Sequence, residues 1–271
     1  MTSDVILDGE LVPAEEATVS VFDVGYQRGF GCFEAMRSYG GVAFRADQHL
    51  ARLASSAAAL GLALPATETL AGWIRDRAET GGDAVVRVFV SATDFESDPR
   101  IVVFAEDIPE VPPVLRLLPL GAPWHPASRD TELAGAKTMS YAPNLAATRH
   151  AVADGFHDAL LLDADGFVLE GPTYSVGWVS DGSMRTPALG QGILGSITRE
   201  ATLEVAAGAS VEVQEDRFKL DDVLSADEVF VMSTVREVRP VIAVGDTSFD
   251  TGPVTEQLAT GFRRLVVAET T

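Results

Sequence analysis

The sequence predicts an α/β (α+β) protein of two domains, a small N-terminal α/β domain and a larger C-terminal domain. The chain has 271 residues, 46% of them hydrophobic, which is enough to bury one large or two modest cores. Short apolar runs of strand length alternate with longer stretches of helical spacing. Three prolines fall within five positions just before residue 114, and proline stops both helices and strand pairing. We therefore expect a small domain over residues 1–107, a linker over 108–122 and a large domain over 123–271.

The N-terminal elements follow from turn signals and hydrophobic spacing. Asp8-Gly9 between two apolar runs is typical of a tight hairpin turn. Leucines and alanines recur at helical spacing after Gln48, and the near-continuous apolar run from Ala84 indicates a strand buried on both faces. The expected elements are a hairpin over Val5–Val12, strands over Val19–Phe22, Ala84–Ala92 and Arg100–Phe104, and helices over Gln48–Leu62 and Thr67–Thr80.

The segment Asp23–Arg37 is rich in glycine. Gly25, Gly29 and Gly31 fall within seven residues, so the backbone there adopts unusual dihedral angles or is approached closely by something else. The spacing does not match a phosphate-binding fingerprint, because no third glycine stands at the required spacing and no Gly-Lys-Ser/Thr follows. We therefore expect a close-approach surface in this segment.

The C-terminal domain is predicted to be rich in strands. Asp163–Gly166 is typical of a turn between two of them, and Gly195–Arg199 leads into a helix that continues to about Ala207. The other expected helices cover Asn144–Asp154 and Val254–Val267. The expected strands are Val114–Leu118, Asp158–Leu162, Phe167–Glu170, Tyr174–Val179, Val211–Val213, Glu228–Met232 and Pro240–Val244.

Composition excludes several classes of partner. The formal charge of −20 argues against nucleic acid and anionic membranes, whereas an anionic small substrate remains compatible if local arginines overcome the field. Cys32 is the only cysteine, so we expect neither a disulfide framework nor a cysteine metal site, and no metal. The start Met1–Asp4 has no signal-peptide pattern, and no apolar run reaches the length of a membrane helix. We expect a cytoplasmic protein.

Lysine is nearly absent from the chain, which draws attention to Lys137. The sequence contains only two lysines, Lys137 and Lys219. Lysine, unlike arginine, can lose its proton and attack a carbonyl to form an imine. Lys219 stands among carboxylates that would keep it protonated, whereas Lys137 stands among small and polar residues. Lys137 is either an ordinary surface lysine or an imine-forming one.

Two further features favour the second interpretation. Glu170 ends a predicted strand just before Gly171-Pro172, and Gly195–Thr198 opens a predicted helix whose free N–H groups would bind an anion. A lysine, a carboxylate and a helix-start phosphate site are together what pyridoxal phosphate requires. Each feature also has a plain structural explanation, as a strand-end charge and as a helix cap.

Several blocks of sequence, in one order, resemble a known family along nearly the whole chain. The chain is similar to class IV aminotransferases, the fold-type IV pyridoxal-phosphate enzymes, which include branched-chain, D-amino acid and (R)-amine transaminases and aminodeoxychorismate lyase. The blocks are Gly25–Gln27, Phe33-Glu34, His49–Leu53, Lys137, Asp165-Gly166, Glu170-Gly171, Thr186-Pro187, Gly195–Arg199 and Ala226–Phe230.

The resemblance implies a fold and a set of site residues. It implies a large cofactor-binding domain with a β-barrel-like sheet core, and a homodimer in which the partner subunit completes each active site. It implies that Lys137 is the Schiff-base lysine and that Glu170 is the partner of the pyridine nitrogen. Arg52 resembles the phosphate-binding arginine, and Tyr141 is expected near the phenolic oxygen of the cofactor. The remaining phosphate contacts would come from Ile197, Thr198, Ser233 and Thr234.

The substrate is left open by departures from the family pattern. Ser175 stands where relatives usually carry Asn, the Arg-x-His pair of well-known D-amino acid transaminases is missing, and the residues after Lys137 look closest to some aminodeoxychorismate lyases. A D-amino acid transaminase that uses 2-oxo acids, with (R)-amines as further substrates, is the main hypothesis. An aminodeoxychorismate lyase, a branched-chain L-amino acid transaminase and a non-catalytic binding module are alternatives. Substrate-binding candidates are Arg28, Phe33 and Arg87.

Overall fold

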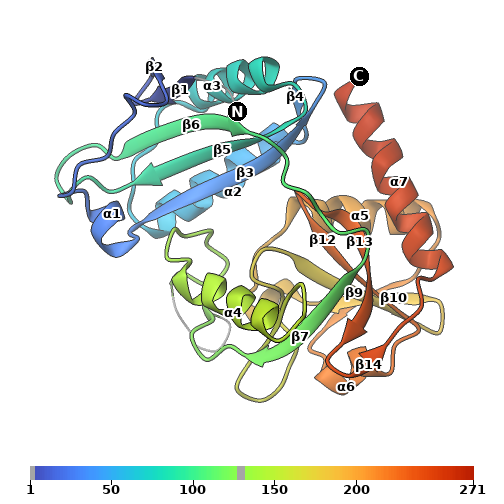
Figure 1. Ribbon diagram of the computed structural model, residues 1–271. Coiled ribbons are helices and arrows are strands. Elements are labelled where there is room, and N and C mark those ends of the chain that lie inside the picture. Colours follow the sequence, from blue (N-terminus) through green and yellow to red (C-terminus); the bar gives the residue numbers. More distant parts are fainter. Residues whose placement is uncertain (1–3, 127–131) are drawn as a thin grey trace. The chain divides into compact units, whose positions relative to one another are not determined.

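The computed structural model describes residues 4–126 and 132–271 (Figure 1). Of the start Met1–Asp4, on which the sequence analysis made a prediction, Met1–Ser3 lie outside the described residues. The chain forms two compact units. The first contains residues 4–110, Ala136–Tyr141 and Glu269–Thr271, and the second contains Val111–Gly135 and Ala142–Ala268. This division follows from which residues contact one another within the chain. The expected limits of the two domains and of the linker stay a prediction.

The first unit is built on a six-stranded sheet with the order β2-β1-β6-β5-β3-β4. All its neighbouring strands are antiparallel. An antiparallel sheet commonly packs only one of its two faces against the core. The strands are β1 (Asp4–Leu7), β2 (Glu10–Pro13), β3 (Gly31–Tyr39), β4 (Val42–Ala43), β5 (Ala84–Ser91) and β6 (Arg100–Glu106). The helices are α1 (Val24–Arg28), α2 (Ala46–Ala59) and α3 (Thr67–Gly81).

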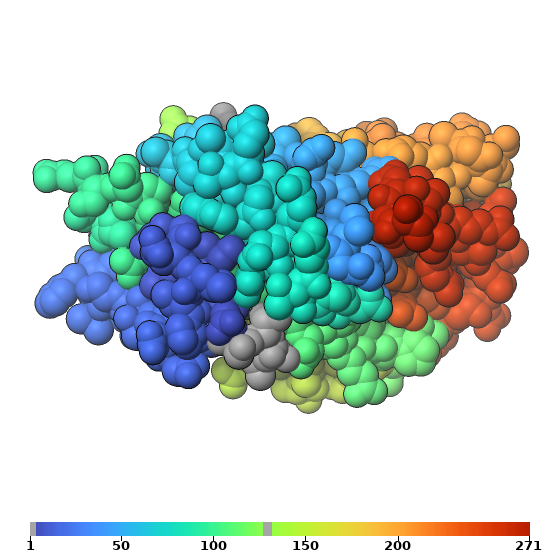
Figure 2. Space-filling view, turned by 90° about the horizontal axis from the view of Figure 1, so that it is seen from above, coloured from blue at the N-terminus to red at the C-terminus, as the bar shows by residue number. Residues whose placement is uncertain are grey.

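The predicted N-terminal hairpin is present as β1 and β2. Asp8 and Gly9 form its turn with φ values of 51° and 94°, the left-handed region that such turns need and that glycine adopts without strain. A Cβ added at Gly9 would lie 3.1 Å from the ring of Trp73 on α3. The blue hairpin and the teal α3 region accordingly lie next to each other in Figure 2.

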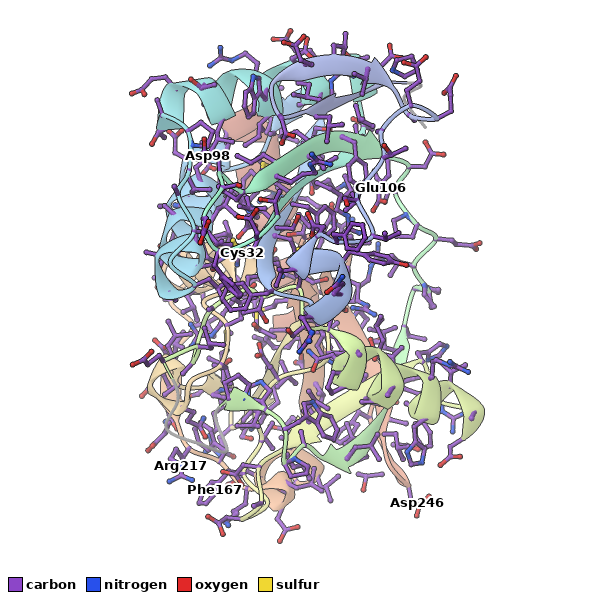
Figure 3. All side chains as sticks on the ribbon, turned by 90° about the vertical axis from the view of Figure 1, so that its left-hand side faces the viewer. Cys32, Asp98, Glu106, Phe167, Arg217 and Asp246 are labelled. Atoms are coloured by element: carbon purple, nitrogen blue, oxygen red, sulfur yellow. The ribbon has the colours of Figure 1, made fainter. Side chains whose placement is uncertain are left out.

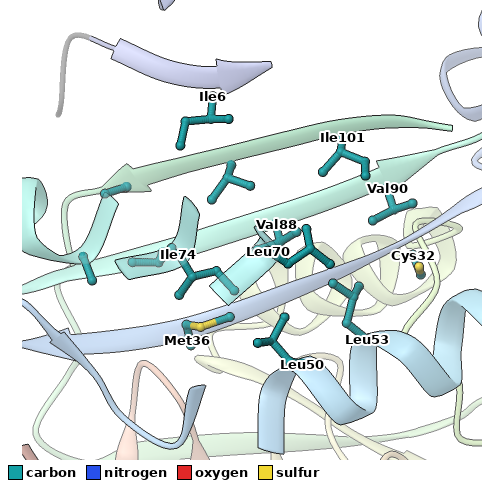
Figure 4. Close-up of a cluster of buried hydrophobic side chains, with 14 of the residues drawn as sticks. Ile6, Cys32, Met36, Leu50, Leu53, Leu70, Ile74, Val88, Val90 and Ile101 are labelled. Carbon is teal, nitrogen blue, oxygen red and sulfur yellow. The ribbon is translucent and has the colours of Figure 1, made fainter. Parts of the chain in front are cut away.

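Helices α2 and α3 cover one face of this sheet and form its core (Figure 4). The inward side chains come from every second residue of β3, β5 and β6, as the period of a strand requires. Cys32 and Met36 of β3 meet Leu50 and Leu53 of α2 in this cluster. The opposite face of β5 carries Arg87 and Phe89, so the expected burial of this strand on both faces is only partial.

The second unit is built on an eight-stranded sheet. The strand path is β11-β10-β9-β12-β13-β7-β8, and β14 pairs with β13. Three neighbouring pairs are parallel, namely β7 with β8, β7 with β13 and β10 with β11. The strands are β7 (Leu115–Gly121), β8 (Asp158–Leu162), β9 (Ser175–Ser180), β10 (Ser183–Pro187), β11 (Val213–Asp216), β12 (Glu228–Ser233), β13 (Glu237–Val244) and β14 (Thr247–Ser248).

The helical elements of the second unit are α4 (Ala142–Ala153), α5 (Ile197–Gly208), α6 (Leu220–Leu224), α7 (Pro253–Thr270) and the short 3-10 helix η2 (Leu189–Gln191). Helix α5 packs on β12 and β13. The core of the sheet contains the fully buried Trp178, whose ring meets the edge of Phe218 at a centroid distance of 5.0 Å. Phe167, at the end of this unit shown lowest in Figure 3, lies beside Arg217, whose guanidinium carbon is 4.0 Å from the ring centroid.

The predicted mixed α/β fold is confirmed, with corrections at several elements. The strand expected over Val19–Phe22 is wrong, because these residues form coil and a turn. The segment Phe167–Glu170 forms only isolated bridges, and the strand expected over Val211–Val213 begins at its last residue. No helix in the described ranges combines the length and apolar character that a membrane crossing needs.

Candidate active site

Lys137 lies on an added strand-like segment beside β3 in the first unit. The N–H of Phe33 donates to the carbonyl of Lys137 at 3.0 Å, and the N–H of Met139 donates to the carbonyl of Gly31 at 2.7 Å. A Cβ at Gly31 would lie 2.5 Å from Met139 Sδ and from a β5 carbonyl. Glycine at position 31 therefore allows the lysine segment to pair with β3, which gives the predicted close approach one physical cause.

The side chain of Lys137 lies over an aromatic ring. Its Nζ is 4.5 Å from the ring centroid of Phe33, and its backbone N–H donates to Ser56 Oγ of α2 at 3.0 Å. The Phe33 ring also meets the edge of Tyr141 at 5.4 Å and stacks on Phe89 at 5.5 Å. The first unit therefore brings together three of the predicted site residues, since Lys137 and Tyr141 both contact the ring of Phe33.

Arg52, on α2, is tied to the opposite face of β3. Its Nε and Nη2 donate to the two carboxylate oxygens of Glu34 at 2.7 Å each. His49, one turn earlier on α2, contacts Glu34 Oε2 through Nδ1 at 2.7 Å. Because an ionised carboxylate only accepts hydrogen bonds, Nδ1 carries the proton of the neutral His49 ring. Glu34 and His49 are both fully or almost fully buried.

Burial and the charges within this cluster shift the pKa values of Glu34, His49 and Cys32. Burial alone would raise the pKa of Glu34, but hydrogen bonds from Arg52 and His49 outweigh burial and lower that pKa to about 2. Burial lowers the pKa of His49 more than its bond to Glu34 raises it, and the charges of Arg52 and Lys137 lower it further. The pKa of Cys32 rises to about 12, first by burial and then by the charge of Glu34. The cluster therefore holds an anionic Glu34, a neutral His49 and an inert thiol.

Arg87 and Arg28 occupy different settings in the first unit. Arg87 lies on the face of β5 that carries Phe89, diagonally across from Phe33, because Ala35 pairs with Arg87 and Phe33 pairs with Phe89. Its Nε and Nη2 bind Glu106 of β6 at 2.7 and 2.6 Å (Glu106 is labelled in Figure 3). Arg28 is exposed in the last turn of the short helix α1. The structure thus brings Arg87 near Phe33 but engages it with a carboxylate.

Glu170 lies in the second unit and accepts two kinds of hydrogen bond. His125 Nε2 is 3.0 Å from Glu170 Oε1, and the N–H of Leu194 donates to the two carboxylate oxygens at 3.2 and 3.3 Å. Leu194 stands three residues before the start of α5, so this contact links the carboxylate to the segment that opens the helix. The side chain of Glu170 is 13% exposed, which leaves part of the carboxylate accessible.

The first turn of α5 has the features that the sequence analysis expected of an anion site. Ser196 is its N-cap and accepts from the N–H of Arg199 at 3.2 Å, while Ile197 and Thr198 are buried in the first turn. A Cβ added at Gly195 would meet nothing within 4 Å, so there is open space before the helix start. Free N–H groups, a positive dipole end and a nearby hydroxyl suit a phosphate.

Ser233 is the last residue of β12, one of the strands that α5 packs against, and Thr234 follows it. Ser233 Oγ accepts from the N–H of Arg236 at 3.1 Å. The guanidinium of Arg236 donates to Asp158 at 2.7 Å and to Thr173 Oγ1 at 2.7 Å. The turn that carries Ser233 and Thr234 is therefore fixed to β8 and to the loop after Glu170.

Three polar contributors to these sites had no predicted role. Glu34 and His49 lie within blocks that carry the family resemblance, but their pairing depends on α2 crossing β3. Two features of the sequence could have indicated this pairing: a carboxylate on the inward face of a strand, and the His49-x-x-Arg52 spacing, which places both side chains on one face of a helix. His125 has no local signal, because its contact with Glu170 arises from strand order.

Taken separately, the two units supply the groups that pyridoxal phosphate needs. The first offers the Lys137 amine and the Arg52 guanidinium, and the second offers the Glu170 carboxylate and the α5 start. An amine reacts with an aldehyde, a carboxylate accepts from a protonated pyridine nitrogen, and a helix start binds phosphate. The donor set fits this cofactor.

The chain is similar to known aminotransferases along nearly its whole length. The family model of amino-transferase class IV matches residues 31–244. A putative branched-chain-amino-acid aminotransferase of Methanocaldococcus jannaschii is 32% identical, over 96% of this chain and 96% of that protein. A D-alanine aminotransferase of Listeria innocua is 30% identical, over 97% and 96%.

Solved structures give the same result. The branched-chain aminotransferase of Thermoproteus uzoniensis, solved with norvaline, is 27% identical with a TM-score of 0.87, over 98% of this chain and 95% of that chain. A second branched-chain amino acid aminotransferase, also 27% identical, has a TM-score of 0.90 over 98% and 95% of the two chains. That enzyme was solved in complex with N-(5'-phosphopyridoxyl)-L-glutamate.

Proposed function

Because the chain belongs to the class IV aminotransferase family, we propose that it is a transaminase whose amino donors are D-amino acids. Its cofactor is pyridoxal 5'-phosphate. The bound cofactor supplies an aldehyde that condenses with amines and a ring that accepts electrons from the bond being broken. The proposed acceptors are 2-oxo acids such as 2-oxoglutarate, with (R)-amines as further donors.

Each proposed residue has a chemical task. Lys137 would hold the aldehyde of the cofactor through Nζ, and after its release the same nitrogen would move a proton to and from the substrate. Glu170 would accept a hydrogen bond from the ring nitrogen. Arg52, the start of α5, Thr198, Ser233 and Thr234 are the groups that would bind the phosphate. Tyr141 contributes its hydroxyl near the phenolic oxygen, and its edge contact with Phe33 supports a fixed ring position.

The contact of Lys137 with Phe33 is the observation that carries the catalytic part of this proposal. The ring centroid lies 4.5 Å from Nζ, and the face of an aromatic ring attracts an ammonium group. This contact fixes the position of Nζ, from which the amine can react with an aldehyde. Arg87, on the same face of the sheet as Phe33, supports a substrate with a carboxylate.

A second candidate is a branched-chain L-amino acid transaminase, which the similarity to the Methanocaldococcus jannaschii protein favours. An aminodeoxychorismate lyase is a third. Purified enzyme with added cofactor would be incubated with D-alanine or L-leucine, each with 2-oxoglutarate, and with aminodeoxychorismate alone. Chiral chromatography of glutamate and an assay of released pyruvate separate the three. D-glutamate formed from D-alanine supports the proposal, and L-glutamate from L-leucine or pyruvate from aminodeoxychorismate contradicts it.

We also propose that two copies associate through the surface around α1. Phe22 and Phe95 are 80% and 77% exposed in the first unit, and Val21 and Tyr26, near Phe22 in sequence, are exposed as well. The two segments adjoin, because the N–H groups of Val24 and Gly25 donate to the carbonyls of Thr93 and Ala92. Neighbouring exposed apolar side chains mark interaction surfaces. Light scattering after gel filtration should give a dimer, and Phe22→Ser with Phe95→Ser should shift it to the monomer. The expected cytoplasmic location stays a prediction.

A further inference from the structure

The order of strands in the second unit brings His125 to Glu170. Strand β7 pairs in parallel with β8, where Gly121 stands opposite Leu162, and Leu162 also forms a bridge with Val168 on its other side. The turn after β7 and the segment that ends in Glu170 therefore both flank the end of β8.

The turn that carries His125 is fixed by its backbone. The N–H of Ala122 donates to the carbonyl of Leu162 at 2.7 Å, and the N–H of His125 donates to the carbonyl of Ala122 at 2.9 Å. Trp124, the residue before the histidine, donates from its indole N–H to Asn144 on α4 at 3.2 Å. The imidazole is thus presented to Glu170 by a short turn that is tied to β8 and to α4.

The contact itself is buried and has a defined polarity. His125 is only 5% exposed, and its Nε2 lies 3.0 Å from Glu170 Oε1. An ionised carboxylate accepts only, so Nε2–H is the donor and the tautomer is set. The N–H of Leu194 is the second donor, at 3.2 and 3.3 Å. A carboxylate has about four acceptor positions, so these contacts orient Glu170 and leave room for another donor.

We propose that His125 is a positioning residue for Glu170, whose carboxylate it holds as the acceptor for the protonated ring nitrogen of pyridoxal phosphate. This inference rests on the proposed function. A buried histidine that served packing alone would be replaceable by an apolar side chain of similar volume, whereas a positioning donor is replaceable only by another donor.

The experiment compares His125→Gln with His125→Leu. Glutamine carries an amide N–H at about the distance of Nε2 from the backbone, and leucine carries none. The cofactor is labelled with ¹⁵N at its ring nitrogen, and the ¹⁵N resonance of the bound form reports whether that nitrogen is protonated. The dissociation constant of the cofactor is measured by fluorescence titration.

We expect the wild type and His125→Gln to give the resonance of a protonated ring nitrogen. We expect His125→Leu to lose part or all of that signal and to bind the cofactor about 10-fold more weakly, the lower end of the range for removing an outer-shell partner of a metal ligand. If His125→Leu does not fold, His125→Asn, whose amide is too short to reach Glu170, takes its place. His150→Leu is the matched control, because His150 is exposed on α4 and its Nε2 lies 3.5 Å from the carboxylate of Asp154.

The outcomes separate the two proposals. An unchanged resonance and affinity in His125→Leu, with a protonated ring nitrogen in the wild type, would overturn the positioning role alone. A wild type without a protonated ring nitrogen, or one whose signal survives Glu170→Gln, would overturn the role proposed for Glu170 itself and with it this inference.

Discussion

Glu34 and Arg52 form a two-point ion pair in the first unit, with 2.7 Å between each carboxylate oxygen and its guanidinium nitrogen. The proposed phosphate-binding arginine is therefore oriented before any ligand is bound. The planar guanidinium offers five N–H donors, so engaging two of them through Glu34 is compatible with a phosphate contact. His49 is a third member of this arrangement and contacts the same carboxylate. The Glu34 carboxylate is therefore the centre of a buried polar cluster.

Glu34→Gln should destabilise the protein strongly. The amide keeps the shape of the side chain but leaves the half-buried Arg52 without its charge partner, and breaking a buried pair costs about 3–5 kcal/mol. Urea unfolding at neutral pH followed by circular dichroism measures the loss. Glu106→Gln is the matched control, because it removes a carboxylate from the partly exposed Arg87 pair and should cost less than about 1 kcal/mol. Equal losses of unfolding free energy in the two variants would show that Glu34 stabilises the fold no more than the partly exposed Glu106 does.

The stabilisation by Glu34 should depend on pH. Its pKa is lowered from 4.5 to about 2 in the folded protein, so the unfolded chain binds the proton more tightly. The contribution is therefore present in full above pH 4.5, decreases as the pH falls towards 2, and is lost below that. Its size is about 3 kcal/mol at 1.36 kcal/mol per pH unit. The difference in unfolding free energy between wild type and Glu34→Gln should shrink between pH 5 and pH 3, and a constant difference would refute the assignment.

Lys137→Ala should abolish turnover and the covalent attachment of the cofactor. Borohydride should fix the cofactor to the wild-type chain, and mass spectrometry should place the adduct on Lys137. Lys219→Ala is the matched control, because Lys219 is the other lysine and its Nζ binds the Asp165 carbonyl and lies 3.7 Å from the Phe167 ring centroid. We expect Lys219→Ala to keep both turnover and adduct. An adduct that survives in Lys137→Ala would contradict the proposed role.

In the first unit, the sequence predicted helices α2 and α3 better than strand β3. Helix α3 matches the expected span to within one residue, because the apolar residues Leu70, Ile74 and Ala78 recur at helical spacing. Strand β3 was not expected, since Glu34 and Arg37 break the apolar alternation and Gly31 opens it. Glu34 is accommodated by a tertiary contact with Arg52 of α2, whereas Arg37 lies over the ring of Tyr39, two residues further along β3, at 4.6 Å. The tertiary contact of Glu34 leaves no mark on local hydrophobic periodicity.

Some residues of the candidate site could likewise be predicted from the sequence, whereas others could not. Lys137 could be singled out from the sequence because lysine is so rare, and Glu170 and α5 because each has a local strand or helix signal. The contact of Glu170 with His125 could not, because the two residues are 45 positions apart and meet through the β7–β8 register. Local chemistry is readable from sequence, whereas long-range pairing requires the sheet topology.

The last prediction concerns the arginines proposed to bind substrate carboxylates. Arg28→Ala and Arg87→Ala should each raise the Michaelis constants for D-glutamate and 2-oxoglutarate far more than that for a simple (R)-amine. The physical reason is that guanidinium groups form paired, charge-assisted bonds with a carboxylate, which a simple amine lacks. Steady-state kinetics with the two types of donor measures the difference.

Arg100→Ala is the matched control for Arg87→Ala. Both arginines lie on neighbouring strands of one sheet, are 26% exposed and pair with a carboxylate, but Arg100 pairs with Asp8. Its replacement should therefore leave the Michaelis constants unchanged. The Glu106 contact makes a second check possible, because Glu106→Gln removes the competitor for Arg87 and should lower the constant for D-glutamate. Equal effects of Arg87→Ala on acidic and simple substrates would instead assign Arg87 to the β5–β6 ion pair alone.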